Sequence, residues 1–209
     1  MIIGVVAWKS EPFGDSGRRK VSEEAAYLGK AVVQEHQILL TGHAPSIGEP
    51  LVEGMEAPTA AALAARDSEV NVAVIAVRPR TSVPEDFTMP VRPWGNGYRL
   101  LIGTGLTSAQ RNPINALTPD VLLCLAGRPG TVSETIYALN ADKIVLFAPQ
   151  CREQISDRLR LMLQENDVDT IVEADKKYRL PGTSGKLGSV RSALIMAFVH
   201  SKHCHPTWT

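Results

Sequence analysis

The 209-residue sequence lacks an excess of either charge, because 22 lysines and arginines balance 22 aspartates and glutamates. Proteins that bind nucleic acid or anionic membranes through bulk electrostatics carry a positive excess, so we expect neither partner. No apolar run approaches the length that spans a bilayer. The first residues, MIIGVVAWKSE, lack the basic start and the long apolar stretch of a signal peptide, and they predict a first strand.

Cysteine is also scarce, with only Cys124, Cys151 and Cys204 in the chain. An odd number at scattered spacing does not suggest a disulfide framework, and it favours a reducing, cytoplasmic location. Metal-ligand residue types gather in HSKHCHP, residues 200–206, but no second group of ligands accompanies them. We therefore expect no metal site, and a mobile tail over residues 201–209.

Six short apolar runs are nearly continuous rather than alternating, which is typical of parallel strands buried on both faces. They are IIGVVAW (2–8), QILLTG (37–42), VNVAVIAV (70–77), YRLLIGTG (98–105), DVLLCLAG (120–127) and KIVLFAP (143–149). Helix-like segments alternate with them or follow them, at residues 21–36, 46–66, 108–117, 131–140, 150–165 and 185–202. This order predicts an α/β fold, a Rossmann-like open parallel sheet with helices on both faces, as a single domain over residues 1–209.

One segment interrupts the alternation. Residues 78–97 contain four prolines and no clear periodicity, which predicts a loop. Loops of this length in compact domains are either surface excursions or lids over a binding site, and both interpretations stay open. A lid would use Arg78, Arg80, Arg92 and Trp94.

Ligands of open parallel sheets bind at the carboxyl ends of the strands, and two strand ends here share one design. TGHAPSIGE (41–49) and AGRPGTVSE (126–134) each combine a glycine, a proline and a Ser/Thr-x-x-Glu sequence. Glycine permits close approach of a ligand, and a helix start offers free N–H groups to an anion. The candidate phosphate-binding residues are Gly42, His43, Ser46, Gly48, Gly127, Arg128, Gly130, Thr131 and Ser133.

A purely structural interpretation is also available. SIGE and TVSE are both capping boxes, in which Glu49 and Glu134 would only return a hydrogen bond to the cap N–H. Arg111 is either a solvated helix residue or a planar phosphate ligand over the same strand ends. Asn112 and Asn115 either make polar contacts or cap the turn near Pro113.

Residues 111–147, RNPINALTPDVLLCLAGRPGTVSETIYALNADKIVLF, resemble the LOG or lysine-decarboxylase-like (SLOG) superfamily. The likeness is greatest to its branch of molybdenum cofactor carrier proteins. The family signature is Pro-Gly-Gly-x-Gly-Thr-x-x-Glu, which Gly127, Gly130, Thr131 and Glu134 fit. Arg128 stands where the signature has its second glycine. His43 and Ala44 stand where the first loop of the family has glycines.

The resemblance implies a Rossmann-like fold that forms a homodimer or a larger homo-oligomer. In the carrier branch the cleft holds the molybdopterin cofactor. In the hydrolase branch it cleaves the N-glycosidic bond of a nucleoside 5′-monophosphate, and the matching catalytic residues here are Glu134 and Arg111. Three functions follow: a carrier of a phosphorylated nucleotide-like or pterin ligand, a phosphoribohydrolase, or a scaffold or sensor that has lost its ligand through Arg128, His43 and Ala44.

Overall fold

The computed structural model describes residues 1–7, 14–43, 50–52, 55–71, 73–79, 91–125, 129–141 and 143–147. The predicted helices over 150–165 and 185–202 and the tail over 201–209 lie outside these residues. The elements of the described part are β1 (Ile2–Val6), α1 (Gly14–Gln34), β2 (Ile38–Thr41), α2 (Ala57–Arg66), β3 (Ala73–Arg78), β4 (Val91–Trp94), β5 (Gly97–Gly103), α3 (Asn112–Leu117), β6 (Val121–Cys124), α4 (Pro129–Asn140) and β7 (Ile144–Phe147).

The strands form one seven-stranded sheet in the order β4-β5-β3-β2-β1-β6-β7, so the predicted Rossmann-like fold is confirmed. All neighbouring pairs are parallel except β4 and β5. The chain builds outward from β1 through β2 and β3 to β5, and then returns to place β6 on the other side of β1. The helices that follow β1 and β6, α1 and α4, therefore pack on opposite faces of the sheet, and such a reversal of strand order places a crevice at the carboxyl ends of these strands.

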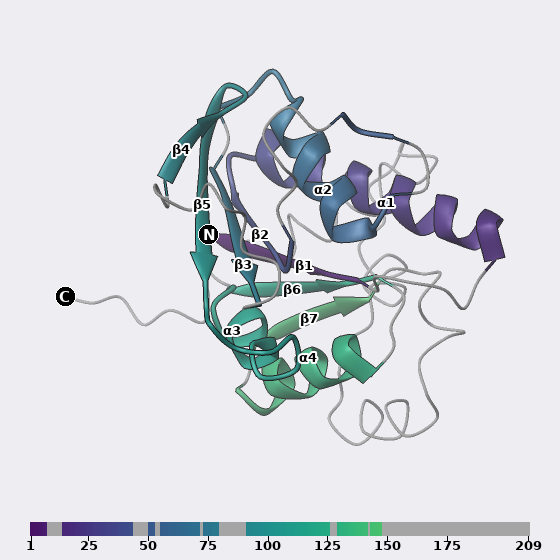
Figure 1. Ribbon diagram of the computed structural model, residues 1–209, viewed down its shortest axis with the longest axis vertical. Coiled ribbons are helices and arrows are strands. Elements are labelled where there is room, and N and C mark those ends of the chain that lie inside the picture. Colours follow the sequence, from purple (N-terminus) through teal and green to yellow (C-terminus); the bar gives the residue numbers. More distant parts are fainter. Residues whose placement is uncertain are drawn as a thin grey trace, which may run out of the picture.

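Helices cover both faces of the sheet, as the sequence predicts. In Figure 1, α1 and α2 lie above the strands and α3 and α4 lie below them. Alternate residues of β6 enter different apolar clusters: Val121 and Leu123 pack on the α1–α2 side, and Leu122 and Cys124 pack on the α3–α4 side. This alternation explains why the strand sequences are apolar at every position.

Proline sets the starts of three helices more accurately than apolar periodicity does. The helix expected from residue 46 begins at Ala57, with Pro58 in its first turn, and α3 begins at Asn112 beside Pro113 rather than at residue 108. The next, α4, begins at Pro129 instead of residue 131. Proline lacks an N–H and is tolerated in the first turn only, so each of these residues marks a helix start. The remaining helix, α1, begins at Gly14, earlier than the predicted residue 21.

The prediction of a loop over residues 78–97 is wrong at its carboxyl end. Residues 91–94 form β4, which pairs antiparallel with β5 at the edge of the sheet, where Pro93 is tolerated because an edge strand needs fewer N–H donors. Trp94 is buried, with the Arg99 guanidinium 5.5 Å and the Arg66 guanidinium 5.9 Å from its ring centre. Trp94 thus anchors the sheet edge and is no lid residue, and residues 80–90 lie outside the described part.

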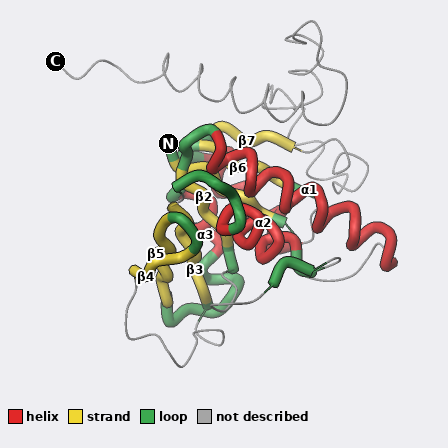
Figure 2. The backbone as a smooth tube through the Cα atoms, turned by 90° about the horizontal axis from the view of Figure 1, so that it is seen from above, coloured by secondary structure: helices red, strands yellow, loops and turns green. Residues whose placement is uncertain are grey.

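The contact between α1 and α2 requires a glycine. Both views place the two helices side by side (Figures 1 and 2), and α2 is buried from Ala57 to Ala65. A Cβ atom on Gly29 of α1 would lie 2.0 Å from the backbone oxygen of Ala61 in α2. The backbone of Ala61 cannot rotate aside as a side chain can, so the helices would have to separate.

We therefore expect Gly29→Ala to lower the free energy of unfolding by about 1–3 kcal/mol, although alanine favours helices over glycine. Urea unfolding followed by circular dichroism measures the change, with Gly130→Ala as the control because a Cβ there meets no atom within 4 Å. A Gly29→Ala protein as stable as the control would contradict the proposed helix contact.

Candidate functional site

A cavity of about 390 Å³ opens at the carboxyl ends of the strands, beside the end of β1 where the strand order reverses. Its volume is in the range of pockets that hold cofactor-sized ligands. It is lined by the end of β1, the residues after β2, the start of α2, the turn before α3 with α3 itself, and the first turns of α4. The lining residues are Val5, Val6, Ala7, Gly42, His43, Pro58, Ser108, Ala109, Arg111, Asn112, Asn115, Pro129, Gly130, Thr131, Ser133 and Glu134.

Arg111 lies at the floor of this cavity and is 8% exposed, so the interpretation of a solvated helix residue is wrong. Its Nη1 donates to the carbonyl oxygens of Gly42 (2.8 Å) and Val77 (2.7 Å), near the ends of β2 and β3. Burial lowers the pKa of the guanidinium, and the nearby charge of Glu134 partly offsets that shift. The two backbone bonds hold one side of the guanidinium, and Nη2 makes no hydrogen bond with the described residues.

Gly42 permits this arrangement because a side chain at its position would collide with the arginine. A Cβ atom there would lie 2.6 Å from Nη1 of Arg111 and 3.1 Å from Nδ2 of Asn115. The φ angle of Gly42 is outside the left-handed region, so space rather than backbone conformation requires the glycine. The sequence predicts that Gly42 permits close approach of a ligand, and in the structure the group that lies against it is Arg111.

Glu134 faces the same cavity from α4. Its side chain is 7% exposed, and its Oε1 accepts a hydrogen bond of 2.8 Å from Nδ2 of Asn115. Burial raises the pKa of the Glu134 carboxyl to about 7, against the lowering effects of the Asn115 hydrogen bond and the Arg111 charge. Near neutral pH the carboxyl therefore exists in both protonation states, a property typical of functional sites.

The capping-box interpretation of Thr131 and Glu134 is wrong. Because α4 starts at Pro129, Thr131 lies inside the first turn and is no N-cap residue, and Glu134 bonds to Asn115 of another helix. Gly130 is exposed at the cavity, and a Cβ atom on it would meet nothing within 4 Å. The first turn of α4 therefore leaves space beside backbone N–H groups, which is the arrangement that binds anions.

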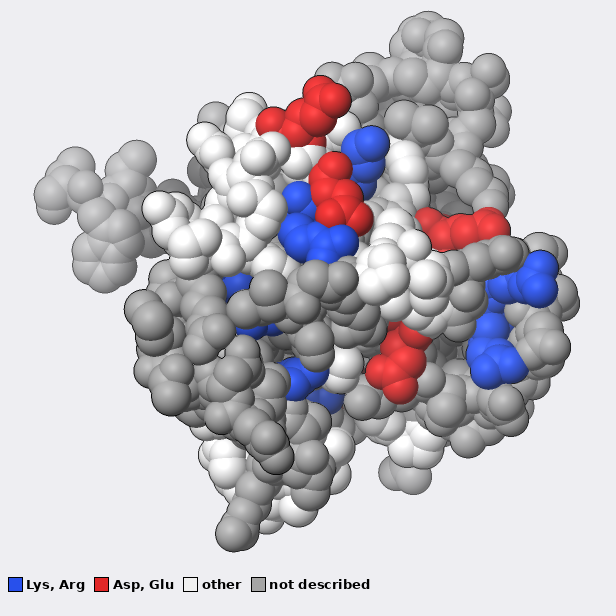
Figure 3. All heavy atoms as spheres, turned by 45° about the horizontal axis from the view of Figure 1, so that its top comes forward, with Lys and Arg blue, Asp and Glu red and all other residues white. Residues whose placement is uncertain are grey.

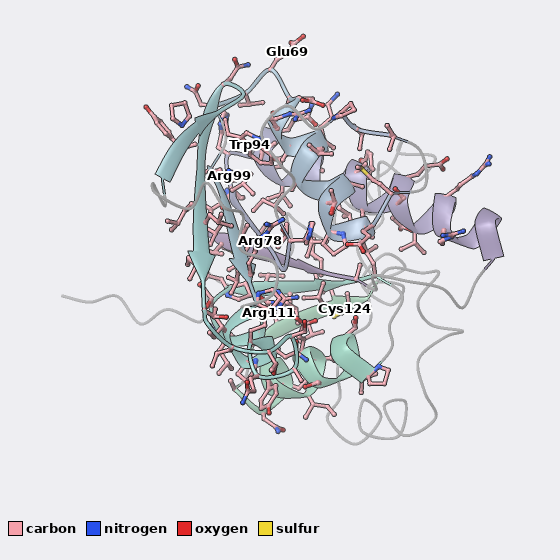
Figure 4. The ribbon with its side chains drawn as sticks, viewed as in Figure 1. Glu69, Arg78, Trp94, Arg99, Arg111 and Cys124 are labelled. Carbon is pink, nitrogen blue, oxygen red and sulfur yellow. The ribbon has the colours of Figure 1, made fainter. Side chains whose placement is uncertain are left out.

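His43 lies at another wall of the cavity, next to α2. Its Nδ1 is 2.7 Å from the Thr59 hydroxyl, and its Nε2 is 3.4 Å from Nη2 of Arg78. Because a guanidinium can only donate, Nε2 is the acceptor in that contact and Nδ1 carries the proton of the neutral ring. His43 is therefore fixed between two side chains, and Arg78 is buried behind it at the end of β3 rather than in a lid (Figure 4).

Cys124 ends β6 close to the site, but it has the properties of a core residue. Burial raises the pKa of its thiol to about 12. The Thr135 hydroxyl donates to the carbonyl of Thr131, so the contact of 3.3 Å between Cys124 and Thr135 leaves the thiol as donor. A protonated, buried thiol is no nucleophile.

Seven of the predicted site residues thus line one cavity: Gly42, His43, Arg111, Gly130, Thr131, Ser133 and Glu134. Ser46, Gly48, Gly127 and Arg128 lie outside the described residues. The sequence interpretation did not assign Asn115 or Thr59 to the site. Asn115 follows Arg111 by one helical turn, and this spacing could have placed both on one face of α3.

The described residues contain no group of three metal-ligating side chains, and none of their helices is long and apolar enough to cross a bilayer. On the face drawn in Figure 3, the coloured side chains of opposite sign are interspersed rather than separated.

Comparisons with known proteins agree with the geometry. The model of the SLOG cluster4 family matches residues 1–177. A molybdenum cofactor binding protein from the phototrophic bacterium Rippkaea orientalis is 23% identical, with a TM-score of 0.59 over 95% of this chain and 96% of that one. The molybdenum cofactor carrier protein of Chlamydomonas reinhardtii is also 23% identical, with a TM-score of 0.59 over 95% and 98% of the two chains.

A third structure, DNA processing protein A from Helicobacter pylori, is described as binding single-stranded DNA. It is 11% identical, with a TM-score of 0.50 over 82% of this chain and 75% of that one. The comparison with curated sequences gives no match. At these identities the structures share the fold, and the fold alone does not decide the ligand.

Proposed function

Because the chain belongs to the SLOG cluster4 family, we propose that it binds a phosphorylated small molecule, nucleotide-like or pterin, in the cavity at the carboxyl ends of the strands. One observation carries the proposal: the cavity brings the fixed guanidinium of Arg111 together with the open first turn of α4. A guanidinium and a helix N-terminus are the two groups that proteins most often offer to phosphate.

The roles of the residues follow from their positions. Nη2 of Arg111 pairs with a phosphate oxygen, since Nη1 is already bonded to two carbonyls. Backbone N–H groups of Gly130 and Thr131, with the side chains of Thr131 and Ser133, bind the other oxygens. Ser46, Gly48, Gly127 and Arg128 complete the site from the neighbouring loops in this proposal.

Molybdopterin cofactor is the ligand that the structural relatives favour, because two of them are described as binding or carrying the molybdenum cofactor. Its phosphate would occupy the α4 end of the cavity, and its pterin the apolar wall formed by Val5, Val6 and Pro58. We also propose, on the family resemblance, that the chain acts as a cytoplasmic homo-oligomer.

A thermal-shift screen with inorganic phosphate, nucleoside monophosphates and phosphorylated pterins tests the binding. A ligand at a hundredfold excess over its Kd adds about 2.7 kcal/mol, which corresponds to a rise in Tm of roughly 5–10 °C for a chain of this size. If no anion raises the Tm, the proposal fails and the scaffold or sensor without a ligand takes its place.

Gly130→Val is the variant that reports on the anion position. A side chain on Gly130 meets no protein atom within 4 Å, so we expect the stability of the free protein to change by less than about 0.5 kcal/mol. The valine would occupy the space beside the α4 N–H groups, and ligand affinity should fall at least about tenfold, a cost of 1.4 kcal/mol. Unchanged affinity, measured by calorimetry, would place the anion elsewhere.

A second candidate function is hydrolysis of the N-glycosidic bond of a nucleoside 5′-monophosphate, and Glu134 is the observation that favours it. A buried carboxyl with a pKa of about 7 suits a group that accepts and returns protons at neutral pH. Glu134 would take a proton from a water molecule as the water oxygen bonds to the sugar carbon. The base would leave with the electron pair of the broken N-glycosidic bond and receive that proton from Glu134, while Arg111 holds the phosphate. The test is release of free base from nucleoside monophosphates by the purified protein. If Glu134→Gln stops this release while the ligand still binds, the protein is a hydrolase rather than a carrier.

A further inference from the structure

Only one end of the Asn115 amide forms a hydrogen bond with the described residues. Asn115 is 1% exposed and lines the cavity from α3. Its Nδ2 donates to Glu134, whereas its Oδ1 is buried and accepts no hydrogen bond from the described residues. A buried amide oxygen without a donor is unfavourable, and such a group in a native protein calls for a physical reason.

The orientation of this amide follows from its neighbours. An ionised Glu134 can only accept, so the NH₂ end of Asn115 must face it and the oxygen must point elsewhere. Nδ2 also lies on the side of Gly42, 3.1 Å from where a Cβ would stand there. Oδ1 is therefore the free end of the amide.

Arg111, the N-cap residue of α3 and four residues earlier, is also incompletely paired, because its buried Nε has no partner among the described residues. Two residues on one face of a short helix thus present an unpaired donor and an unpaired acceptor beside one cavity. An anion that carries no hydrogen-bond donor, such as sulfate, could satisfy only the arginine. A ligand that also carries an O–H or N–H group could satisfy both.

We propose that Asn115 determines specificity: its Oδ1 accepts a hydrogen bond from a hydroxyl or ring N–H that the ligand carries in addition to its phosphate. The inference rests on the proposed binding of a phosphorylated ligand. A sugar phosphate supplies the donor as a hydroxyl, and a pterin or guanine supplies it as a ring N–H. The site then prefers such esters over anions that carry no donor, because only a donor pairs the buried oxygen.

Two matched pairs of probes identify the donor by calorimetry. Ribose 5-phosphate and pentyl phosphate differ in hydroxyl groups, and guanosine 5′-monophosphate and its 1-methyl derivative differ in a ring N–H. The unchanged protein should bind the donor-bearing member of at least one pair about tenfold to a hundredfold more tightly. In Asn115→Ala that ratio should fall to near one, while the affinity for sulfate, which carries no donor, changes by less than threefold.

A merely structural role of Asn115 would weaken all probes equally and leave the ratios unchanged. Asn140→Ala is the control, since it deletes the same amide from an exposed helix position outside the cavity lining and should keep the ratio. Asn115→Ala could fold poorly because it removes the hydrogen-bond donor of the buried Glu134 carboxylate. In that case the same substitution is tested in a Glu134→Gln background, which has no carboxylate at position 134. Unchanged ratios in both pairs would overturn the inference, whereas absent binding of every phosphate to the unchanged protein would overturn the proposed function.

Discussion

The Glu134→Gln variant is expected to be more stable than the unchanged protein at pH 8, by about 3 kcal/mol. Burial raises the pKa of the Glu134 carboxyl from 4.5 to about 7 in the folded protein. A shift of this size corresponds to about 3 kcal/mol between the two protonation states. Glutamine keeps an oxygen that accepts the hydrogen bond of Asn115, but it carries no charge that must be buried.

The direction of the pH dependence follows from linkage. Between pH 4.5 and about 7 the unfolded chain loses the Glu134 proton while the folded protein keeps it. The unfolded state then binds fewer protons, so the free energy of unfolding falls as the pH rises through this window and is level above it. Below pH 4.5 both states are protonated, and the unchanged protein and the variant should differ little.

Urea unfolding at pH 4.5, 6 and 8 measures the difference between the two proteins. Glu23→Gln makes the same chemical change at an exposed position of α1 and should alter stability by less than about 0.5 kcal/mol at each pH. A Glu134→Gln protein that is less stable at pH 8 would show that ionised Glu134 is held by attraction to Arg111 rather than penalised by burial. A Glu134→Gln protein that is more stable at pH 8 would identify Glu134 as a residue retained for function at the expense of stability.

The sequence predicts the fold well because the signal for a doubly covered parallel sheet is strong. Every residue of β6 is buried, so the strand is recognisable without any tertiary information. The edge strand β4 escaped prediction, since an edge strand with a proline has neither continuous apolar character nor regular alternation. Helix starts were misplaced where periodicity was preferred to the first-turn prolines.

The sequence allows the residues of the candidate site to be predicted, but not the hydrogen bonds between them. Arg111 and Glu134 could be selected from the family signature, and topology brings both to one cavity. The carbonyl partners of Arg111, Gly42 and Val77, belong to other strand ends and are set by the strand order. No local pattern encodes that order, and for the same reason the bond between Asn115 and Glu134 could not be foreseen.

Gly42→Ala is expected to damage the site through a single methyl group. The added Cβ would lie 2.6 Å from Nη1 and 3.0 Å from Nη2 of Arg111, so the guanidinium must move away from the carbonyls of Gly42 and Val77. Lost charge-assisted hydrogen bonds and overpacking should together lower the free energy of unfolding by about 2–4 kcal/mol. Affinity for a phosphorylated ligand should fall roughly a hundredfold, because the displaced arginine no longer faces the anion.

A double-mutant cycle separates this mechanism from a general intolerance of side chains at position 42. When Arg111 is replaced by methionine, the flexible thioether can yield to the new methyl group, so Gly42→Ala should then cost less than about 1 kcal/mol. Gly130→Ala makes the same substitution across the cavity, where a Cβ meets nothing within 4 Å, and it should leave stability unchanged or slightly raised. If Gly42→Ala costs as much without Arg111 as with it, the glycine serves the backbone instead, and the fixed guanidinium loses its structural basis. A large coupling between the two positions would instead show that the end of β2 is shaped around a preorganised cation, which is what the proposed phosphate site requires.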